Sequence, residues 1–107
     1  MIEIEADTYF VRIYIAGDVN PAYDIIRREC AKGGMCVTVE KVKYMYCRGE
    51  EEGYVVGFIN YPRFKEEKHL IFNTAVRLAK TLVNETYQKS ATILSPNKTL
   101  FISMDDK

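Results

Sequence analysis

The apolar residues of this chain repeat every two residues in some segments and at helical spacing in others, and the order of these segments restricts the fold. Residues 8–16 alternate β-branched and aromatic side chains, which is typical of a strand. Helical spacing recurs after Pro21 and again in a longer segment that begins with two acidic residues. We predict strands over residues 8–16, 35–47, 54–61, 90–95 and 99–103, and helices over 20–33 and 66–88.

This order predicts the fold class. The first six segments read strand, helix, strand, strand, helix, strand, which is the split arrangement of ferredoxin-like folds. We therefore expect one α+β domain over residues 1–107, a ferredoxin-like fold with an added C-terminal strand. Two helices should cover one face of a mainly antiparallel sheet. Its expected strand order is 2-3-1-4, with the fifth strand beside the fourth.

Local patterns predict how these segments begin and end. Asn20 before Pro21 is expected to cap the first helix, and Gly33-Gly34 to end it. The apolar side of the second strand changes near Glu40-Lys41, which predicts a bulge or bend there. The acidic run 48–53 is expected to form the turn into the third strand.

The first and third strands are central in this topology, so they decide what both faces of the sheet look like. The residues assigned to the helix side are Val11, Ile13, Ile15, Val55, Gly57 and Ile59. The opposite face would then be aromatic, although an antiparallel sheet covered on one side normally has a polar outer face. Arg63 should lie beside that face, while Phe64 should pack the second helix against the sheet. The candidate binding residues are Phe10, Arg12, Tyr14, Tyr54, Phe58 and Arg63.

Three explanations of an aromatic face compete. Another part of the chain covers it, or it contacts a second copy (a homodimer) or a host protein, because exposed apolar patches mark contacts. Alternatively it stacks bases, as RNA-recognition domains of this fold do. Fifteen basic residues balance fifteen acidic ones, and Glu50–Glu52 would repel phosphates, so nucleic-acid binding ranks below protein binding. A small nucleotide signal, bound by Arg12 or Arg63 and tyrosines, is a further alternative.

The sequence contains no recognisable catalytic constellation. A pair of His69 with Cys36 or Cys47 would have no third group to orient it, and a run of surface carboxylates binds a hard cation weakly. No glycine-rich phosphate loop is present. We therefore predict a protein that is not an enzyme and has no catalytic residue, metal site or cofactor.

The cysteine content and the absence of a signal predict the compartment. The three cysteines, Cys30, Cys36 and Cys47, are an odd number without a secretory signal, which indicates reduced thiols. No apolar run approaches the roughly 18 residues that a membrane span needs. We expect the protein in the cytoplasm of a bacterial host.

A family resemblance adds a genetic setting. The run GGMCVTVEKVKYMYCRGEEEGYVVGFINYPRF, with the earlier VRIYIAGD and the later SATILSPNKTLFIS, resembles a group of small uncharacterised proteins encoded by bacteriophages and prophages. The likeness covers most of the chain, but the group's pattern has a proline where this chain has Lys65. The resemblance implies a small accessory phage protein that binds a host protein, such as a defence component, stoichiometrically. It agrees with the prediction of a non-catalytic binding protein.

Overall fold

Five strands and two α-helices make up most of the computed structural model, which describes residues 1–105. The strands are β1 (Phe10–Ala16), β2 (Thr38–Tyr46), β3 (Gly49–Ile59), β4 (Ser90–Leu94) and β5 (Thr99–Ser103). The helices are α1 (Val19–Gly33) and α2 (Lys68–Glu85), and a 3-10 turn, η1 (Pro62–Phe64), lies between β3 and α2.

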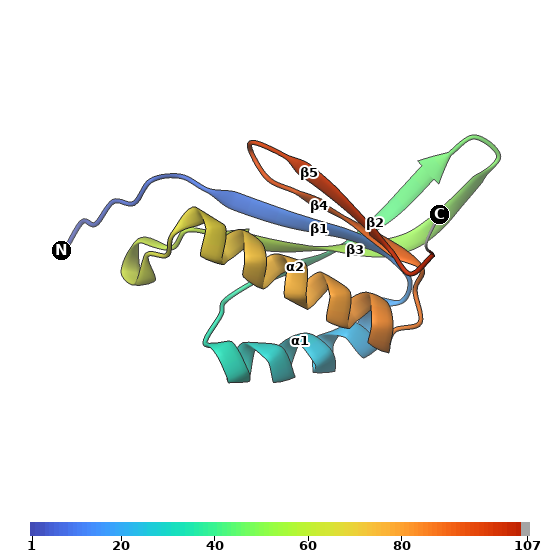
Figure 1. The fold of residues 1–107 in the computed structure, drawn as a ribbon, viewed down its shortest axis with the longest axis horizontal. Coiled ribbons are helices and arrows are strands. Elements are labelled where there is room, and N and C mark those ends of the chain that lie inside the picture. Colours follow the sequence, from blue (N-terminus) through green and yellow to red (C-terminus); the bar gives the residue numbers. More distant parts are fainter. Residues whose placement is uncertain (106–107) are drawn as a thin grey trace.

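The strands form one antiparallel sheet in the order β2-β3-β1-β4-β5. Both helices cover the same face of this sheet, and the β4–β5 hairpin forms the edge farthest from β2 (Figure 1). The predicted α+β fold, ferredoxin-like with an added C-terminal strand, is therefore confirmed. No helix within residues 1–105 is both long enough and apolar enough to cross a bilayer.

The pairing of β1 with β3 decides which side chains face the helices. Val11 lies opposite Phe58 and Ile15 lies opposite Tyr54, and directly opposed residues point to the same side of a sheet. Tyr54 and Phe58 are therefore core residues, with relative exposures of 0% and 5%. Their predicted position on the open face is wrong. The residues from Tyr54 to Phe58 do not alternate between apolar and polar types, and a slip of one residue exchanges the faces.

On the open face, the side chain of Tyr44 crosses Gly53 and connects β2 to β1. Its hydroxyl lies 3.2 Å from the carbonyl oxygens of both Ile15 and Tyr54. A β-carbon at Gly53 would contact the Tyr44 ring and lie 2.5 Å from the Ile15 oxygen, so only glycine leaves room for this crossing. Gly57 also lies on this face, where an added β-carbon would meet the Thr38 hydroxyl oxygen, and not against a helix as expected.

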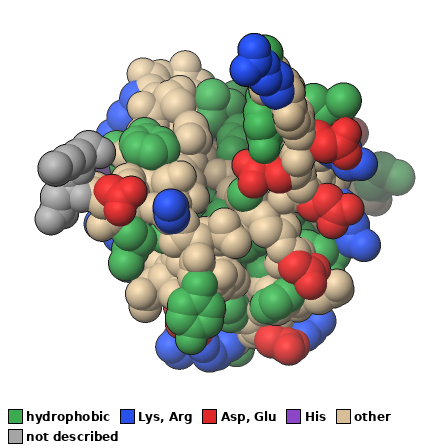
Figure 2. Space-filling model, turned by 90° about the vertical axis from the view of Figure 1, so that its right-hand side faces the viewer, with side chains coloured by type: hydrophobic (Ala, Val, Ile, Leu, Met, Phe, Trp, Pro, Cys, Tyr) green, Lys and Arg blue, Asp and Glu red, His purple; other side chains and the backbone are tan. Residues whose placement is uncertain are grey.

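Beyond the helices, β2 and β3 continue as a two-stranded ribbon (Figure 1). Their register is unbroken from Thr38 opposite Gly57 to Tyr46 opposite Gly49, so the predicted bulge does not interrupt these strands. The turn is Cys47-Arg48, and the acidic residues expected in it belong to β3 instead. Figure 2 views the end of the molecule that carries the ribbon tip, where acidic and basic side chains are mixed with apolar ones.

The helix ends lie close to their predicted positions. The cap of α1 is Asp18 instead of Asn20, because the Asp18 carboxylate accepts a hydrogen bond of 3.0 Å from the Asn20 backbone N–H. Gly34 ends α1 in the left-handed conformation with φ 65°, as predicted. The helix α2 is shorter than expected, with Glu67 at its N-cap.

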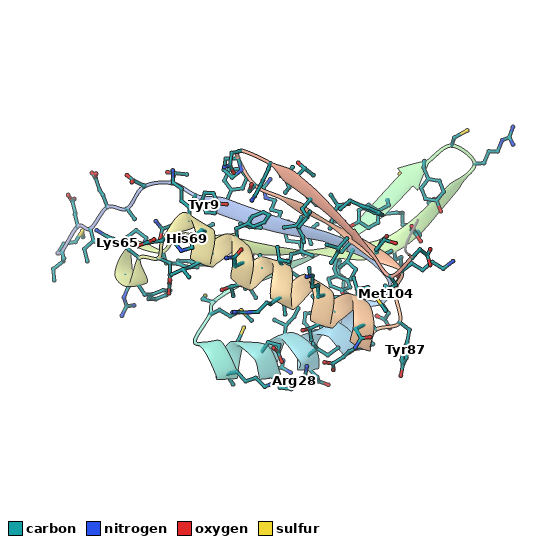
Figure 3. All side chains as sticks on the ribbon, viewed as in Figure 1. Tyr9, Arg28, Lys65, His69, Tyr87 and Met104 are labelled. Atoms are coloured by element: carbon teal, nitrogen blue, oxygen red, sulfur yellow. The ribbon has the colours of Figure 1, made fainter. Side chains whose placement is uncertain are left out.

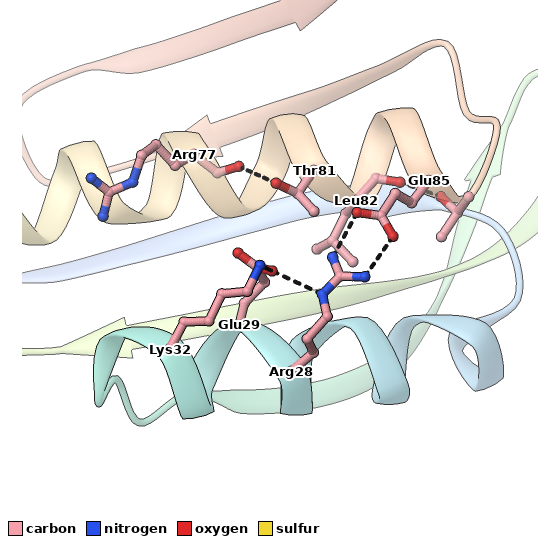
Figure 4. Close-up of polar contacts among 8 residues, drawn as sticks. Arg28, Glu29, Lys32, Arg77, Thr81, Leu82 and Glu85 are labelled. Carbon is pink, nitrogen blue, oxygen red and sulfur yellow. Dashed lines mark hydrogen bonds and ion pairs between the residues drawn. The ribbon is translucent and has the colours of Figure 1, made fainter.

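An ion-pair network joins the two helices (Figure 4). Arg28 of α1 donates hydrogen bonds of 2.9 and 2.6 Å to the two carboxylate oxygens of Glu85 in α2. It donates another of 3.0 Å to Glu29, which also accepts one from Lys32. The hydrogen bond with Arg28 is the main reason why the pKa values of Glu29 and Glu85 lie below their ordinary value.

Replacing Arg28 by methionine is expected to make the free energy of unfolding change less as the pH is lowered. Because the folded-state pKa values of Glu29 and Glu85 lie below 4.5, their contribution is present above about pH 4.5 and is lost as the pH falls through the lowered values. The difference in free energy of unfolding between wild type and Arg28→Met should therefore shrink from neutral pH to about pH 3. Urea unfolding at several pH values measures it.

Arg27→Met is the matched control, since it also removes one surface cation from α1 but only an exposed pair with Asp24. If the difference in free energy of unfolding between wild type and Arg28→Met stays constant with pH, the hydrogen bonds of Arg28 do not cause the lowered pKa values of Glu29 and Glu85.

Candidate functional site

The connection between β3 and α2 brings two aromatic side chains together at the end of the sheet. Pro62 has no backbone N–H to extend the strand ladder, so the chain leaves β3 and forms η1. The Phe64 N–H donates a hydrogen bond of 3.0 Å to the Tyr61 carbonyl oxygen, and the two ring centroids are 5.4 Å apart. Phe64 is 52% exposed, so it does not pack α2 against the sheet as expected.

Asn60 holds this connection against the N-terminal arm, residues 1–9. Its backbone N–H donates to the Tyr9 carbonyl oxygen at 3.0 Å, and its side-chain Nδ2 donates to the Asp7 carbonyl oxygen at 2.9 Å. Its Oδ1 accepts a hydrogen bond of 3.0 Å from the backbone N–H of Glu66. One side chain thus connects the arm, the end of β3 and the segment before α2. In Figure 3 this end of the molecule carries the labels Tyr9, Lys65 and His69.

An inner hollow of about 100 Å³ lies beside this connection, next to the end of α1 and the start of α2. Its wall contains apolar, aromatic and acidic groups, among them Met35, Cys36, Phe58, Tyr61, Phe64 and Glu66. Among the described residues that line it, Glu66 alone has a carboxylate. The neighbouring Glu67 does not line this hollow, and its carboxylate lies 3.3 Å from His69 Nδ1.

An outer hollow of about 590 Å³ lies between the connection and the N-terminal arm. It is lined by Ile2 and Ile4 of the arm and by residues 61–64, so Tyr61 and Phe64 border both hollows. The outer hollow is within the range of about 300–1,000 Å³ that is common for ligand pockets, whereas the inner one is too small for a nucleoside. The two hollows together are the candidate site.

The polar groups of the site are set in a largely apolar wall. The Cys36 thiol beside the Tyr61 hydroxyl raises the pKa of Tyr61, so Tyr61 is a neutral hydrogen-bonding group at neutral pH. Within residues 1–105, no group of three or more His, Cys, Asp and Glu side chains is arranged to hold a metal ion. The candidate site thus combines an aromatic pair with one carboxylate, Glu66, and one guanidinium, Arg63.

The residues predicted to bind a ligand are distributed over three places. Phe58 lines the inner hollow and Arg63 the outer one. Phe10, Arg12 and Tyr14 lie on the open face of the sheet, where the Arg12 guanidinium carbon is 5.2 Å from the centroid of the Phe10 ring. Tyr54 is in the core and has no exposed surface for a ligand. The structure does not bring these six residues together, and their binding roles stay predictions.

Sequence reasoning missed Tyr61 and Glu66. In the sequence, Glu66 is only one of the two acidic residues that begin the second predicted helix, and Tyr61 is the last residue of the third predicted strand. The available signal was the break at Pro62, because binding residues are often on loops that a rigid scaffold positions.

Two further hollows differ from the candidate site in the side chains that line them. One of about 460 Å³ lies between α2 and β5, and its carboxylate, Glu85, is already paired with Arg28. Another of about 400 Å³ lies at the start of α1 and is bordered by two basic and two acidic side chains, Lys41, Lys43, Asp18 and Glu52. Neither combines an aromatic pair with a carboxylate that lacks a cationic partner among residues 1–105.

The fold is shared with solved structures of an enzyme. A phage SAM lyase in complex with S-methyl-5'-thioadenosine matches with a TM-score of 0.75 and 12% sequence identity, over 100% of this chain and 98% of that chain. A phage SAM lyase in the apo state matches with a TM-score of 0.71 and 15% identity over the same shares of both chains. No family model matches the chain. No curated protein matches it either.

This likeness overturns the function and the partners predicted from the sequence. The structures of this fold belong to an enzyme with a small-molecule ligand, so the prediction of a non-catalytic protein is wrong. The expected partners, a host protein or a second copy in a homodimer, are not supported, and neither is the sequestration of a nucleotide signal or the binding of nucleic acid. The absence of familiar catalytic residues led to these errors.

Proposed function

We propose that this protein is a lyase that cleaves S-adenosylmethionine (SAM) and releases S-methyl-5'-thioadenosine. The observation that carries the proposal is the likeness to a phage SAM lyase over the whole length of both chains. At 12% identity that likeness by itself concerns the fold, so the proposal also rests on the chemistry of the candidate site. The phage origin implied by the sequence resemblance stays part of the proposal.

The reaction explains why a conventional catalytic constellation is not needed. The sulfur of SAM is a sulfonium, which is an activated leaving group before the enzyme acts. Release of S-methyl-5'-thioadenosine breaks the bond between this sulfur and the γ-carbon of the amino acid part, and the electron pair of the bond goes to the sulfur. The γ-carbon gains an electron pair in turn from an oxygen of the substrate's own carboxylate, which closes a lactone as the second product. A lyase adds no water, so the protein has to bind and orient the substrate more than to supply a nucleophile.

The candidate site provides groups that match the charges of SAM. The Tyr61 and Phe64 rings can contact the adenine or the sulfonium, because aromatic faces attract both bases and cations. Glu66 can pair with the ammonium group of the amino acid part. The positive charge of the sulfur disappears during cleavage, and such a loss of charge is favoured in less polar surroundings. The largely apolar wall of the inner hollow supplies such surroundings.

The other hollows suit this substrate less well. Among the described residues that line them, the hollow at the start of α1 and the groove beside β5 have no aromatic side chain that could contact the adenine or the sulfonium. Glu85 in that groove is also already paired with Arg28. The choice of site is therefore decided by the aromatic pair of Tyr61 and Phe64 and not by volume, since the outer hollow of about 590 Å³ and the hollow of about 460 Å³ beside β5 are similar in size.

Incubation of the purified protein with SAM tests the function. We expect S-methyl-5'-thioadenosine to accumulate at a rate proportional to the protein concentration, without S-adenosylhomocysteine, as measured by liquid chromatography with mass spectrometry. Adding S-methyl-5'-thioadenosine should also raise the melting temperature, because a ligand that binds only the folded state stabilises it. A protein that neither consumes SAM nor is stabilised by the nucleoside would refute the proposal.

A further inference from the structure

We infer that Asn60 is a positioning residue that places the Glu66 carboxylate in the candidate site; the inference rests on the proposed function and deepens it. Asn60 lies at the point where β3 ends, and its side chain uses both of its polar atoms. Oδ1 accepts the hydrogen bond from the Glu66 backbone N–H at 3.0 Å, and Nδ2 donates to the Asp7 carbonyl oxygen at 2.9 Å. The amide therefore has a fixed orientation.

Glu66 needs such an anchor because its own segment provides little. It lies between η1, which ends at Phe64, and α2, whose N-cap is Glu67. The carbonyl oxygen of Glu67 accepts hydrogen bonds from the backbone N–H groups of Leu70 and Ile71 and thereby starts α2. The hydrogen bonds of the helix therefore hold the chain from Glu67 onward and do not include Glu66. The Asn60 side chain holds the Glu66 backbone across a gap of six positions in the sequence.

Asn60 is itself held firmly. Its backbone N–H donates to the Tyr9 carbonyl oxygen at 3.0 Å, which extends the pairing of β1 with β3 by one residue. Tyr9 is buried with 5% relative exposure. The anchor of Glu66 is thus connected directly to the central strands, and a rigid support of this kind is what keeps a binding group in its productive position.

A double-mutant cycle in the full-length protein tests the inference. We expect Asn60→Ala to raise the KM for SAM about 10-fold, because the Glu66 carboxylate loses its position, with kcat and the Kd of S-methyl-5'-thioadenosine nearly unchanged. In a Glu66→Gln background the same substitution should cause little further change, since the group that Asn60 positions is already removed. Asn60→Asp keeps an oxygen for the Glu66 N–H and should retain most of the SAM affinity.

The outcomes separate this inference from the proposed function. If the wild type cleaves SAM but Asn60→Ala and Glu66→Gln have independent, multiplying effects, the inference alone is overturned. The same holds if Asn60→Ala weakens S-methyl-5'-thioadenosine as much as SAM, which a general structural defect would do. If Asn60→Ala does not fold, Asn60→Leu takes its place in the cycle, because leucine keeps the size of the side chain but cannot accept the hydrogen bond from the Glu66 N–H. A wild type that binds neither compound overturns the proposed function and the inference with it.

Discussion

Replacing Tyr54 by alanine is expected to lower the free energy of unfolding by about 3–5 kcal/mol, because the change leaves a cavity the size of an aromatic ring. Tyr54 has no exposed surface, and it lies opposite Ile15 on the helix side of the sheet. For a domain of this size, a loss of this magnitude corresponds to a fall in melting temperature of roughly 15 °C or more. Thermal or urea unfolding followed by circular dichroism measures it.

The control for this prediction is Tyr14→Ala on the open face. Tyr14 is in the neighbouring strand but only half-buried, so its loss should cost clearly less than that of Tyr54. Equal losses for the two variants would indicate that both tyrosines lie on the same kind of surface, which was the expectation from the sequence alone.

The Tyr54 hydroxyl can be tested separately from the ring. It is buried without a hydrogen-bond partner among residues 1–105, although the Thr86 hydroxyl is nearby, so Tyr54→Phe should not destabilise the protein at neutral pH. Burial raises the pKa of Tyr54 to about 12, above its ordinary value of 10. The wild type should therefore lose stability as the pH rises from about 10 to 12, and Tyr54→Phe should lose less.

Much of the fold was predictable from the sequence because the periodic segments are long and their order permits few topologies. The alternation in residues 8–16 and the helical spacing of α2 both predicted the correct element. The prediction was wrong where the local pattern carries no information about orientation. From Tyr54 to Phe58 the run is continuous, so only the pairing with β1 determines its faces.

The candidate site was less predictable because its parts come from distant segments. Cys36 follows α1, Tyr61 follows β3 and Glu66 precedes α2, and no spacing in the sequence relates them. The proposed chemistry also leaves a weak sequence signal. A substrate that carries its own leaving group requires a shaped, oriented site, and single aromatic and acidic residues are common in any domain.

Replacing Glu66 by glutamine is expected to reduce kcat/KM for SAM roughly 10–100-fold, which corresponds to the loss of one charge-assisted hydrogen bond. The carboxylate should contact the ammonium group in the substrate and in the transition state alike, so the loss should be mainly an increase in KM. S-methyl-5'-thioadenosine lacks the amino acid part, and its Kd should therefore change little. Steady-state kinetics measure the KM for SAM, and calorimetry measures the Kd of S-methyl-5'-thioadenosine.

Glu67→Gln is the matched control, because it removes the same charge from the adjacent residue. Glu67 pairs with His69 and does not line the inner hollow, so this variant should keep the wild-type KM. If the two substitutions raise KM equally, the effect is a general attraction between negative charge and a cationic substrate, and it should then fall steeply with added salt. An increase in KM confined to Glu66→Gln and insensitive to salt identifies a direct contact, because groups that touch are screened much less than groups that act at a distance.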